Sequence, residues 1–190
     1  MVQKILLVIT VIVLIIISSC SNNSVEPELQ PGRRDYVWTA DTIKAYYVYF
    51  NSLWGKTVND VWMVSAVGSV FENIYRYDGT KWYRETRTPI GNTVSLWGTE
   101  NNLWISTKDG RIWNYKNDAF FSSQQFLYEG KEIDFFSIAG KNDNEVYAGG
   151  GPRNFMYRKP TVLYKYDGNN WLMSKIIKNG GTITSVSSIM

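Results

Sequence analysis

Residues 95–121 read SLWGTENNLWISTKDGRIWNYKNDAFF, and this stretch decides the fold because the chain contains it three times in variant form. Related segments lie on either side of it, and its glycine, Gly98, is matched by Gly55 and Gly140, which are 43 and 42 residues away. A period near 42 residues, made of short aromatic segments, is typical of the four-stranded blades of a β-propeller.

Each copy divides into four short strands separated by turn residues. The second strand is β-branched and aromatic, as in Val61–Trp62–Met63–Val64, and follows an Asx pair that favours a tight turn. Tyr–Asp–Gly triplets at 77–79 and 166–168 predict the turn between the third and fourth strands, because glycine accepts the positive φ of such turns. No segment after residue 20 has a sustained 3.6-residue apolar period, so we expect almost no helix there.

The pattern as a whole predicts an all-β chain with an incomplete ring of four-stranded antiparallel blades. Residues 35–40 look like a fourth strand that closes a ring, and residues 184–190 look like the first strand of a fourth blade. Three blades lie between them, whereas propellers have four to eight. This favours a truncated chain, and the alternative is a short native protein that pairs with another copy. An open set of blades would expose sheet edges and apolar inter-blade faces.

The first twenty residues have the composition of an export signal. A short charged start precedes residues 5–17, which are apolar except for Thr10 and too few for a membrane-spanning helix of roughly 20 residues. We expect any regular structure there to be helical. Ile17–Ser18–Ser19–Cys20 then resembles the lipobox of bacterial lipoproteins, in which the cysteine receives a diacylglyceryl group and becomes the new N-terminus. The alternative is an ordinary signal peptide or signal anchor with an incidental cysteine.

We therefore expect a lipoprotein signal peptide over 1–19, a flexible tether over 20–34 that carries the lipidated Cys20, and a partial β-propeller over 35–190. The tether contains two prolines and a glycine but no aromatic residue, which is typical of a linker. The resemblance makes the membrane a partner through Cys20 and places the protein outside a bacterial inner or outer membrane. Ser21 stands where some lipoproteins carry the aspartate of inner-membrane retention, which favours the outer membrane.

The repeats also resemble known propeller families. Residues 102–115, NLWISTKDGRIWNY, resemble the regulator-propeller repeat of bacterial sensor proteins, and the segments around Trp54, Trp62 and Trp82 resemble repeats of secreted bacterial propeller lipoproteins. The resemblance covers residues 35–190 and implies the fold alone, because the matching residues are structural. Residues 106–113 come near the Asp-box of sialidase propellers, but Asp109 and Gly110 are adjacent where the Asp-box separates them, which leaves sialidase activity unsupported.

Composition excludes several kinds of chemistry. The chain has no histidine, so the commonest general base and metal ligand is missing, and its single cysteine can form neither an internal disulfide nor a thiolate metal cluster. The net charge of +3 is too small to predict a nucleic-acid surface. We expect no catalytic residue, metal or cofactor in these 190 residues, and no nucleic-acid partner.

The third copy differs from the others by an insertion, which we place at 149–160 between its second and third strands. Insertions outside the repeat register are where repeat proteins place recognition, so we expect a binding loop there with a basic and aromatic tip made by Arg153, Phe155, Tyr157 and Arg158. Its face collects the variable loops, whereas the short Asx and Asp–Gly turns leave the opposite face plain. The partner would be an envelope protein or a glycan. The alternative is a loop without a ligand.

The remaining candidates have a structural interpretation. The tryptophans recur at blade positions, which favours packing between sheets over sugar binding. Glu129, Glu132 and Asp134 could form a Ca²⁺ site, but a solvated loop fits them better. The sequence thus predicts a non-enzymatic binding or scaffold module with an unknown ligand. The alternative is the N-terminal part of a glycan-active propeller enzyme whose catalytic residues lie beyond residue 190.

Overall fold

The computed structural model describes residues 39–43, 48–66, 73–86, 90–153 and 160–178. The chain has two compact units, Met1–Asp41 and Thr42–Met190, and every described strand belongs to the second unit. The described residues form strands, turns and loops without a helix, so none of them provides a helix that could cross a membrane. Cys20 and residues 184–190 lie outside the described residues, as do 35–38 of the expected closing strand, and Thr39 and Ala40 are not in a strand.

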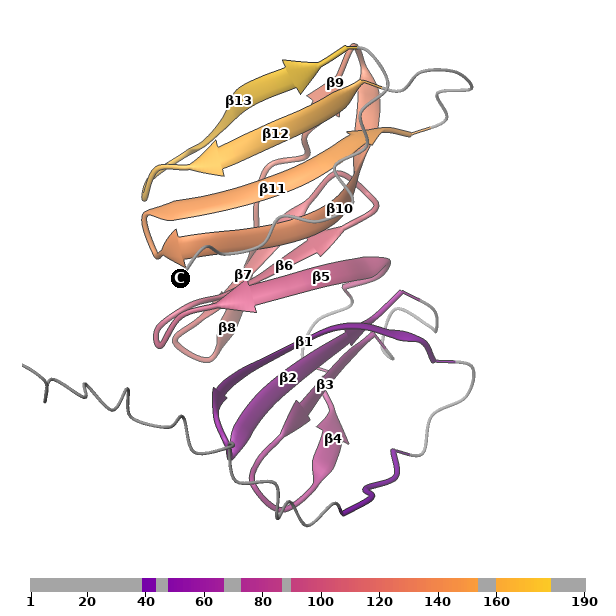
Figure 1. Cartoon of the computed structure of the whole chain (residues 1–190), viewed down its shortest axis with the longest axis vertical. Helices are drawn as coiled ribbons and strands as arrows, with labels where there is room; N and C mark the ends of the chain where they lie inside the picture. Colours follow the sequence, from indigo (N-terminus) through magenta and orange to yellow (C-terminus); the bar gives the residue numbers. More distant parts are fainter. Residues whose placement is uncertain (1–38, 44–47, 67–72, 87–89, 154–159, 179–190) are drawn as a thin grey trace, which may run out of the picture. The chain divides into compact units, whose positions relative to one another are not determined.

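The second unit is built from three antiparallel sheets in chain order, as the sequence predicts for propeller blades (Figure 1). Blade 1 contains β1 (Phe50–Thr57), β2 (Asp60–Ser65), β3 (Ile74–Tyr77) and β4 (Trp82–Arg84). Blade 2 contains β5 (Thr93–Gly98), β6 (Leu103–Thr107), β7 (Ile112–Lys116) and β8 (Ala119–Ser122). Blade 3 contains β9 (Leu127–Tyr128), β10 (Lys131–Asn142), β11 (Glu145–Pro152), β12 (Thr161–Tyr166) and β13 (Trp171–Ile177).

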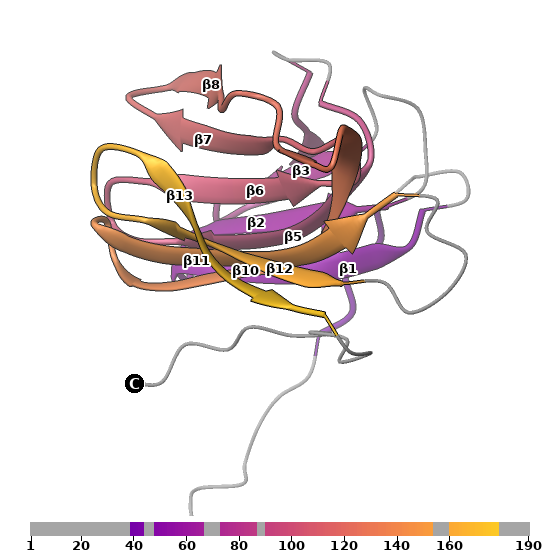
Figure 2. The same ribbon diagram turned by 90° about the horizontal axis from the view of Figure 1, so that it is seen from above.

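The long first strands of the blades lie next to one another, since β1 contacts β5 and β5 contacts β10 (Figure 2). The remaining strands of each blade follow from there in sequence order, except that β9 of blade 3 pairs with the opposite edge of β10. The repeat glycines explain how closely these first strands approach. A Cβ atom on Gly98 would lie 2.9 Å from the Trp54 ring, and one on Gly140 would lie 2.7 Å from the Trp97 ring. The glycine therefore recurs because a tryptophan of the preceding blade lies against it.

The apolar core lies between blades rather than within them. One cluster joins blades 1 and 2 around Trp62 and Ile105, and the other joins blades 2 and 3 around Trp104 and Phe135. Trp62 is 2% exposed and Trp104 is 7% exposed, so the prediction that the repeated tryptophans pack between sheets is confirmed for these two.

The predicted turns between third and fourth strands are confirmed. Gly79 and Gly168 have φ values of 93° and 100°, a region that L-residues rarely adopt. Each turn is closed by the aspartate of its triplet: the Asp78 carboxylate accepts hydrogen bonds from the Thr80 and Lys81 backbone N–H groups, at 2.9 and 3.0 Å. Asp167 accepts from two backbone N–H groups in the same way. Blade 2 makes this turn with Asn117 and Asp118, both at positive φ.

Two expectations about blade 3 were wrong. The sheet has five strands instead of four, because β9 and β10 form a hairpin around Glu129 and Gly130, which both have positive φ. The inserted segment also begins later than expected. Gly149, Gly150, Gly151 and Pro152 belong to β11, where they pair with the lengthened β10. Gly150 lies so close to the Asp134 carbonyl that a side chain would collide with it, which is why a glycine-rich run forms this strand.

Candidate functional site

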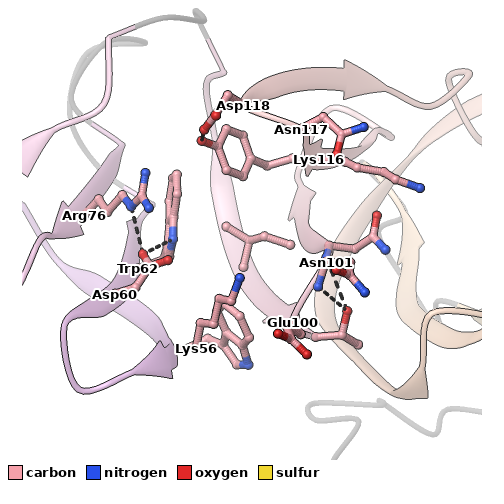
Figure 3. Close-up of a pocket in the computed structure, with 14 residues that line it drawn as sticks. Lys56, Asp60, Trp62, Arg76, Glu100, Asn101, Lys116, Asn117 and Asp118 are labelled. Atoms are coloured by element: carbon pink, nitrogen blue, oxygen red, sulfur yellow. Dashed lines mark hydrogen bonds and ion pairs between the residues drawn. The ribbon is translucent and has the colours of Figure 1, made fainter.

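A cleft of about 250 Å³ lies between blades 1 and 2 (Figure 3). Its walls come from β1, β2 and β3 of blade 1 and, on the blade 2 side, from the β5–β6 turn, the start of β6, the end of β7 and the β7–β8 turn. This is the end of the blades that the sequence expectation treated as plain. The lining residues are Trp54, Lys56, Asp60, Trp62, Arg76, Thr99, Glu100, Asn101, Asn102, Leu103, Tyr115, Lys116, Asn117 and Asp118.

One wall of the cleft is a linked group of three side chains, Asp60, Trp62 and Arg76. Asp60 and Trp62 are two residues apart on β2 and therefore share a face, and Arg76 stands opposite Trp62 in the β2–β3 register. Asp60 Oδ1 accepts hydrogen bonds from Trp62 Nε1 at 3.0 Å and Arg76 Nε at 2.8 Å. The Arg76 guanidinium also lies 4.8 Å from the centre of the Trp62 ring, a cation–π distance.

These contacts hold the charges of the wall in place. Burial alone would lower the pKa of Arg76, but the hydrogen bond that Arg76 donates to Asp60 and the negative charge of Asp60 outweigh that effect and raise the pKa above its ordinary value. The Trp62 ring also contacts Tyr115 of blade 2, with ring centroids 4.8 Å apart. Tyr115 in turn donates a hydrogen bond to Asp118 Oδ1 at 2.7 Å. The Trp62 and Tyr115 rings, which form the floor of the cleft, and the charged wall are therefore both held in place before a ligand binds.

The rim of the cleft carries three charged side chains that are not part of the Asp60–Trp62–Arg76 wall. Lys56 lies on the blade 1 side of the cleft, and Glu100 and Lys116 lie on the blade 2 side (Figure 3). Within the described parts of the chain, these three side chains form no hydrogen bond or ion pair. Nearby, the Thr99 hydroxyl donates to Asp143 of blade 3 and accepts the Asn101 and Asn102 backbone N–H groups. The rim thus offers two free cations and one free anion around a fixed floor.

The arrangement is suited to binding. The Asp60 carboxylate is engaged by Trp62 and Arg76. In the parts of the chain that the structure describes, no group of three or more His, Cys, Asp or Glu side chains is placed to hold a metal ion. What the cleft presents is a set of oriented charges and amides beside aromatic rings.

Blade 3 repeats the wall chemistry with different residues. Glu145, Tyr147 and Lys165 occupy the register positions of Asp60, Trp62 and Arg76. Glu145 Oε1 accepts from the Tyr147 hydroxyl at 2.8 Å and from Lys165 Nζ at 3.3 Å, and Lys165 Nζ lies 5.3 Å from the centre of the Tyr147 ring. The hydrogen bond from Tyr147, followed by that from Lys165, lowers the pKa of Glu145.

Blade 2 has a neutral version of the same group. Asn102, Trp104 and Asn114 stand at the matching positions, and Asn114 Nδ2 donates to the Leu103 carbonyl oxygen at 3.3 Å. In the part of the chain that the structure describes, the buried Trp104 Nε1 has no hydrogen-bond partner.

Of the four residues predicted for the tip of the binding loop, the structure describes Arg153. Its Nε donates to Asp134 Oδ1 at 2.8 Å, and its Nη1 is paired with Glu132. The hydrogen bond to Asp134 raises the pKa of Arg153 despite partial burial. Glu132 and Asp134, considered above as a solvated loop or a Ca²⁺ site, are therefore strand residues that hold an arginine. Phe155, Tyr157 and Arg158 lie outside the described residues.

Arg153 lies near the β6–β7 turn of blade 2. Gln125 Nε2 donates to the Asp109 carbonyl oxygen at 3.2 Å and to Glu132 Oε1 at 2.6 Å, which links the β6–β7 turn of blade 2 to the base of the insertion. The described part of this region is a network of internal contacts. The prediction that the tip of the insertion lies on the face with the variable loops stays a prediction.

No family model and no curated protein sequence matches the chain. Two of the solved structures that resemble it are propellers at low sequence identity. The computationally designed Ika4 protein is 14% identical, with a TM-score of 0.49, and the match covers 74% of this chain and 81% of that one. The structure described as YCF48 bound to D1 peptide is 18% identical, with a TM-score of 0.40, and the match covers 65% of this chain and 39% of that one.

Proposed function

We propose that this protein is a lipid-anchored propeller of the bacterial cell envelope that works as a non-enzymatic binding module, and that the cleft between blades 1 and 2 holds a segment of a partner protein. The observation that carries the proposal is the set of uncompensated charges, Lys56, Glu100 and Lys116, around a floor that is already organised. Charges arranged in this way favour a partner of complementary charge pattern.

The burial of the Trp62 ring supports a protein partner over a glycan. A sugar stacks on an open aromatic face, but Trp62 is 2% exposed, with Arg76 near one part of its ring system and Tyr115 against it. A volume of about 250 Å³ accommodates a few side chains of a larger partner. We expect that partner to place a carboxylate near Lys56 or Lys116 and a basic side chain near Glu100.

The anchor rests on the sequence of residues 17–20. Lipidation of Cys20 would keep the blades at the membrane surface, with residues 21–34 as the spacer. Metabolic labelling with a fatty-acid analogue tests this part: we expect label on the wild-type protein and none on Cys20→Ala. Equal labelling of the two proteins would refute the anchor while leaving the binding proposal open.

Site-specific photocrosslinking in cells tests the cleft. A photoreactive amino acid at Asn101, on the rim, should give a discrete adduct with one protein. The double charge reversal Lys56→Glu and Lys116→Glu should reduce that adduct at least tenfold. The matched control is Lys175→Glu, a charge reversal at an exposed lysine of β13, far along the chain from the cleft. Adduct that survives the double reversal, or that the control removes equally, would contradict the proposal.

A further inference from the structure

A second hollow, of about 280 Å³, adjoins the cleft between blades 1 and 2. Four residues line both spaces, namely Trp54, Lys56, Thr99 and Glu100. Gly55 and Thr57, at the end of β1, complete the second hollow, whereas the cleft reaches β3 and β7. The two spaces therefore form one groove, which follows the seam between the blades from their first strands to their third strands.

An extra residue of blade 1 lies in the middle of this groove. In blade 1, Lys56 separates Gly55 from Thr57, and the β1–β2 register shifts at this point, which marks a β-bulge. Blade 2 has no such residue, since Thr99 follows Gly98 directly and the β5–β6 register is unshifted there. Bulges redirect the side chains of a strand, and here the bulged residue, Lys56, lines both the cleft and the second hollow.

The neighbouring seam, between blades 2 and 3, is bridged at the matching point. The Thr99 hydroxyl of blade 2 donates a hydrogen bond to Asp143 of blade 3. Thr57 is the blade 1 equivalent of Thr99, because each hydroxyl accepts the backbone N–H two residues later. Asn142 accepts an N–H in the same way, so the residue after it, Asp143, is the equivalent of Glu100. Within the described residues, no hydrogen bond joins Thr57 to Glu100, although both line the second hollow, so this seam is open there.

Both walls of the groove are held in place before a ligand binds. On blade 1, the Trp54 ring lies against Gly98, where a Cβ atom would approach the ring to 2.9 Å. On blade 2, the Thr99 hydroxyl accepts the backbone N–H groups of Asn101 and Asn102, both at 3.3 Å, and also donates to blade 3. A preformed groove of this kind suits a flexible ligand, because only the ligand then loses conformational freedom on binding.

The two ends of the groove differ in chemistry. The half-buried Trp54 side chain and Gly55 bound the second hollow, which suits an apolar side chain. The cleft has Lys116 on its rim, unpaired within the described residues, which suits a carboxylate. Where the two spaces meet, Lys56 of blade 1 and Glu100 of blade 2 stand on opposite sides (Figure 3). A ligand that fills the groove therefore needs an apolar group at one end and an acid at the other.

We infer that the groove binds an extended peptide segment, with an acidic side chain in the cleft and an apolar side chain two residues away in the second hollow. This inference rests on the proposed function, because it names the part of the partner that enters the same cleft. Side chains two residues apart on an extended chain point to the same side, about 6.5 Å from each other along the chain, and can enter adjoining spaces. The residue between them points away from the floor, so it can provide the basic side chain expected beside Glu100 on the rim.

Photocrosslinking in cells from both ends of the groove tests this inference separately from the proposed function. A photoreactive amino acid at Asn101 probes the cleft, and one at Thr57 probes the second hollow. We expect both to capture the same protein, and mass spectrometry of the adducts should place the two attachment sites within a few residues of each other in one segment. Capture from Asn101 alone, or attachment to two separate segments, would overturn the inference and leave the proposed function standing. No adduct from Asn101 would contradict both.

A fluorescent synthetic peptide that spans the attachment sites then tests each end of the groove by fluorescence anisotropy. Thr57→Trp fills the second hollow and Lys116→Glu reverses the charge of the cleft rim, so each should raise the dissociation constant at least tenfold. The matched control is Val58→Trp, the same substitution one residue later, at a side chain that is 85% exposed and lines neither space. This control should bind the peptide like the wild-type protein.

Thermal unfolding of each variant shows whether it is folded. Where Thr57→Trp does not fold, replacing the apolar residue of the peptide by aspartate takes its place and should cause the same loss of affinity for the wild-type protein. Unchanged affinity in these tests of the second hollow would overturn the inference. An equal loss of affinity in Val58→Trp would overturn it too.

Discussion

The two blade interfaces of this chain share an apolar contact and differ in the polar groups around it. At both, a tryptophan of the second strand packs on a tyrosine of the next blade, with centroid distances of 4.8 and 4.9 Å. At the first interface the indole N–H of Trp62 is bonded to Asp60, beside Arg76 and the charged cleft. At the second, Trp104 Nε1 has no hydrogen-bond partner among the described residues, and asparagines, Asn102 and Asn114, stand at the positions of the acid and the cation.

This difference distinguishes the apolar contacts that build the fold from the polar groups around them, which vary between blades. The aromatic pairs, and the glycines under the first-strand tryptophans, recur because the blades cannot pack without them. The acid and cation beside the tryptophan vary from blade to blade, so they are free to serve a local purpose. The following predictions test that separation, from the largest expected effect to the smallest.

Truncating either tryptophan should have the largest effect. Trp62→Ala and Trp104→Ala each remove a buried indole, which usually costs about 3–5 kcal/mol of unfolding free energy. For a chain of this size, each kcal/mol corresponds to roughly 2–4 °C in melting temperature. Thermal unfolding of the two variants should show losses of similar size. A shift below about 2 °C in either variant would mean that its interface does not depend on the aromatic contact.

Adding a methyl group at the repeat glycines should distinguish a covered position from an open one. Gly98→Ala places a Cβ 2.9 Å from both the Trp54 ring and the Asn102 carbonyl oxygen, and overpacking of this kind costs about 1–3 kcal/mol. Gly55→Ala meets its nearest atom, Cγ2 of Val61, at 3.4 Å, so we expect a change within about 0.5 kcal/mol. Chemical denaturation measures both. Equal destabilisation would show that Gly55 is also covered.

Replacing the indole by a phenyl ring tests the polar difference directly. Trp62→Phe removes a hydrogen bond to a half-buried carboxylate and should cost about 1–2 kcal/mol beyond the loss of ring area. Trp104→Phe removes an N–H group that is buried without a partner, so its loss should be smaller by about that amount. Denaturation midpoints of the two variants give the comparison. A larger loss for Trp104→Phe would contradict the account.

The smallest expected effect is a pH dependence at the β3–β4 turn. Hydrogen bonds from the Thr80 hydroxyl and then from the Lys81 and Thr80 backbone N–H groups lower the pKa of Asp78 from 3.8 to about 2. Because the folded pKa is lowered, the stabilisation is complete above about pH 4 and disappears as the pH falls through about 2. The difference in melting temperature between wild type and Asp78→Ala should shrink over this window. A constant difference from pH 7 to pH 2 would refute the role of the carboxylate.

Much of the fold follows from local chemistry that a sequence displays. Repeated aromatic residues, Asx turns and the Tyr–Asp–Gly triplets predict the blades and their strand order, since each signal acts within a few residues. The prediction that residues 149–152 belong to a loop was wrong. Glycines usually indicate a loop, whereas here they allow β11 to approach Asp134 closely. The β9–β10 hairpin was missed although Glu129–Gly130 is a turn signal.

The candidate site was less predictable. A cleft between blades depends on how two blades pack, and no local pattern encodes that placement. The sequence predicts Arg153 as part of a basic and aromatic binding tip, but in the structure its guanidinium is paired with Glu132 and Asp134. A signal for the wall was present: an acid, an aromatic residue two positions later and a cation on the next strand recur as Asp60, Trp62 and Arg76 and again in blade 3.

A double-mutant cycle between Trp62 and Tyr115 tests the central claim most directly, because it measures the contact between two blades without the contributions that each side chain makes alone. Unfolding free energies would be measured for the wild-type chain, Trp62→Ala, Tyr115→Ala and the double variant. The ring centroids lie 4.8 Å apart at 51°, and aromatic pairs of this kind contribute about 0.5–1.5 kcal/mol. We predict a coupling in this range, whereas additive losses from the two substitutions would show that blades 1 and 2 do not pack through this contact.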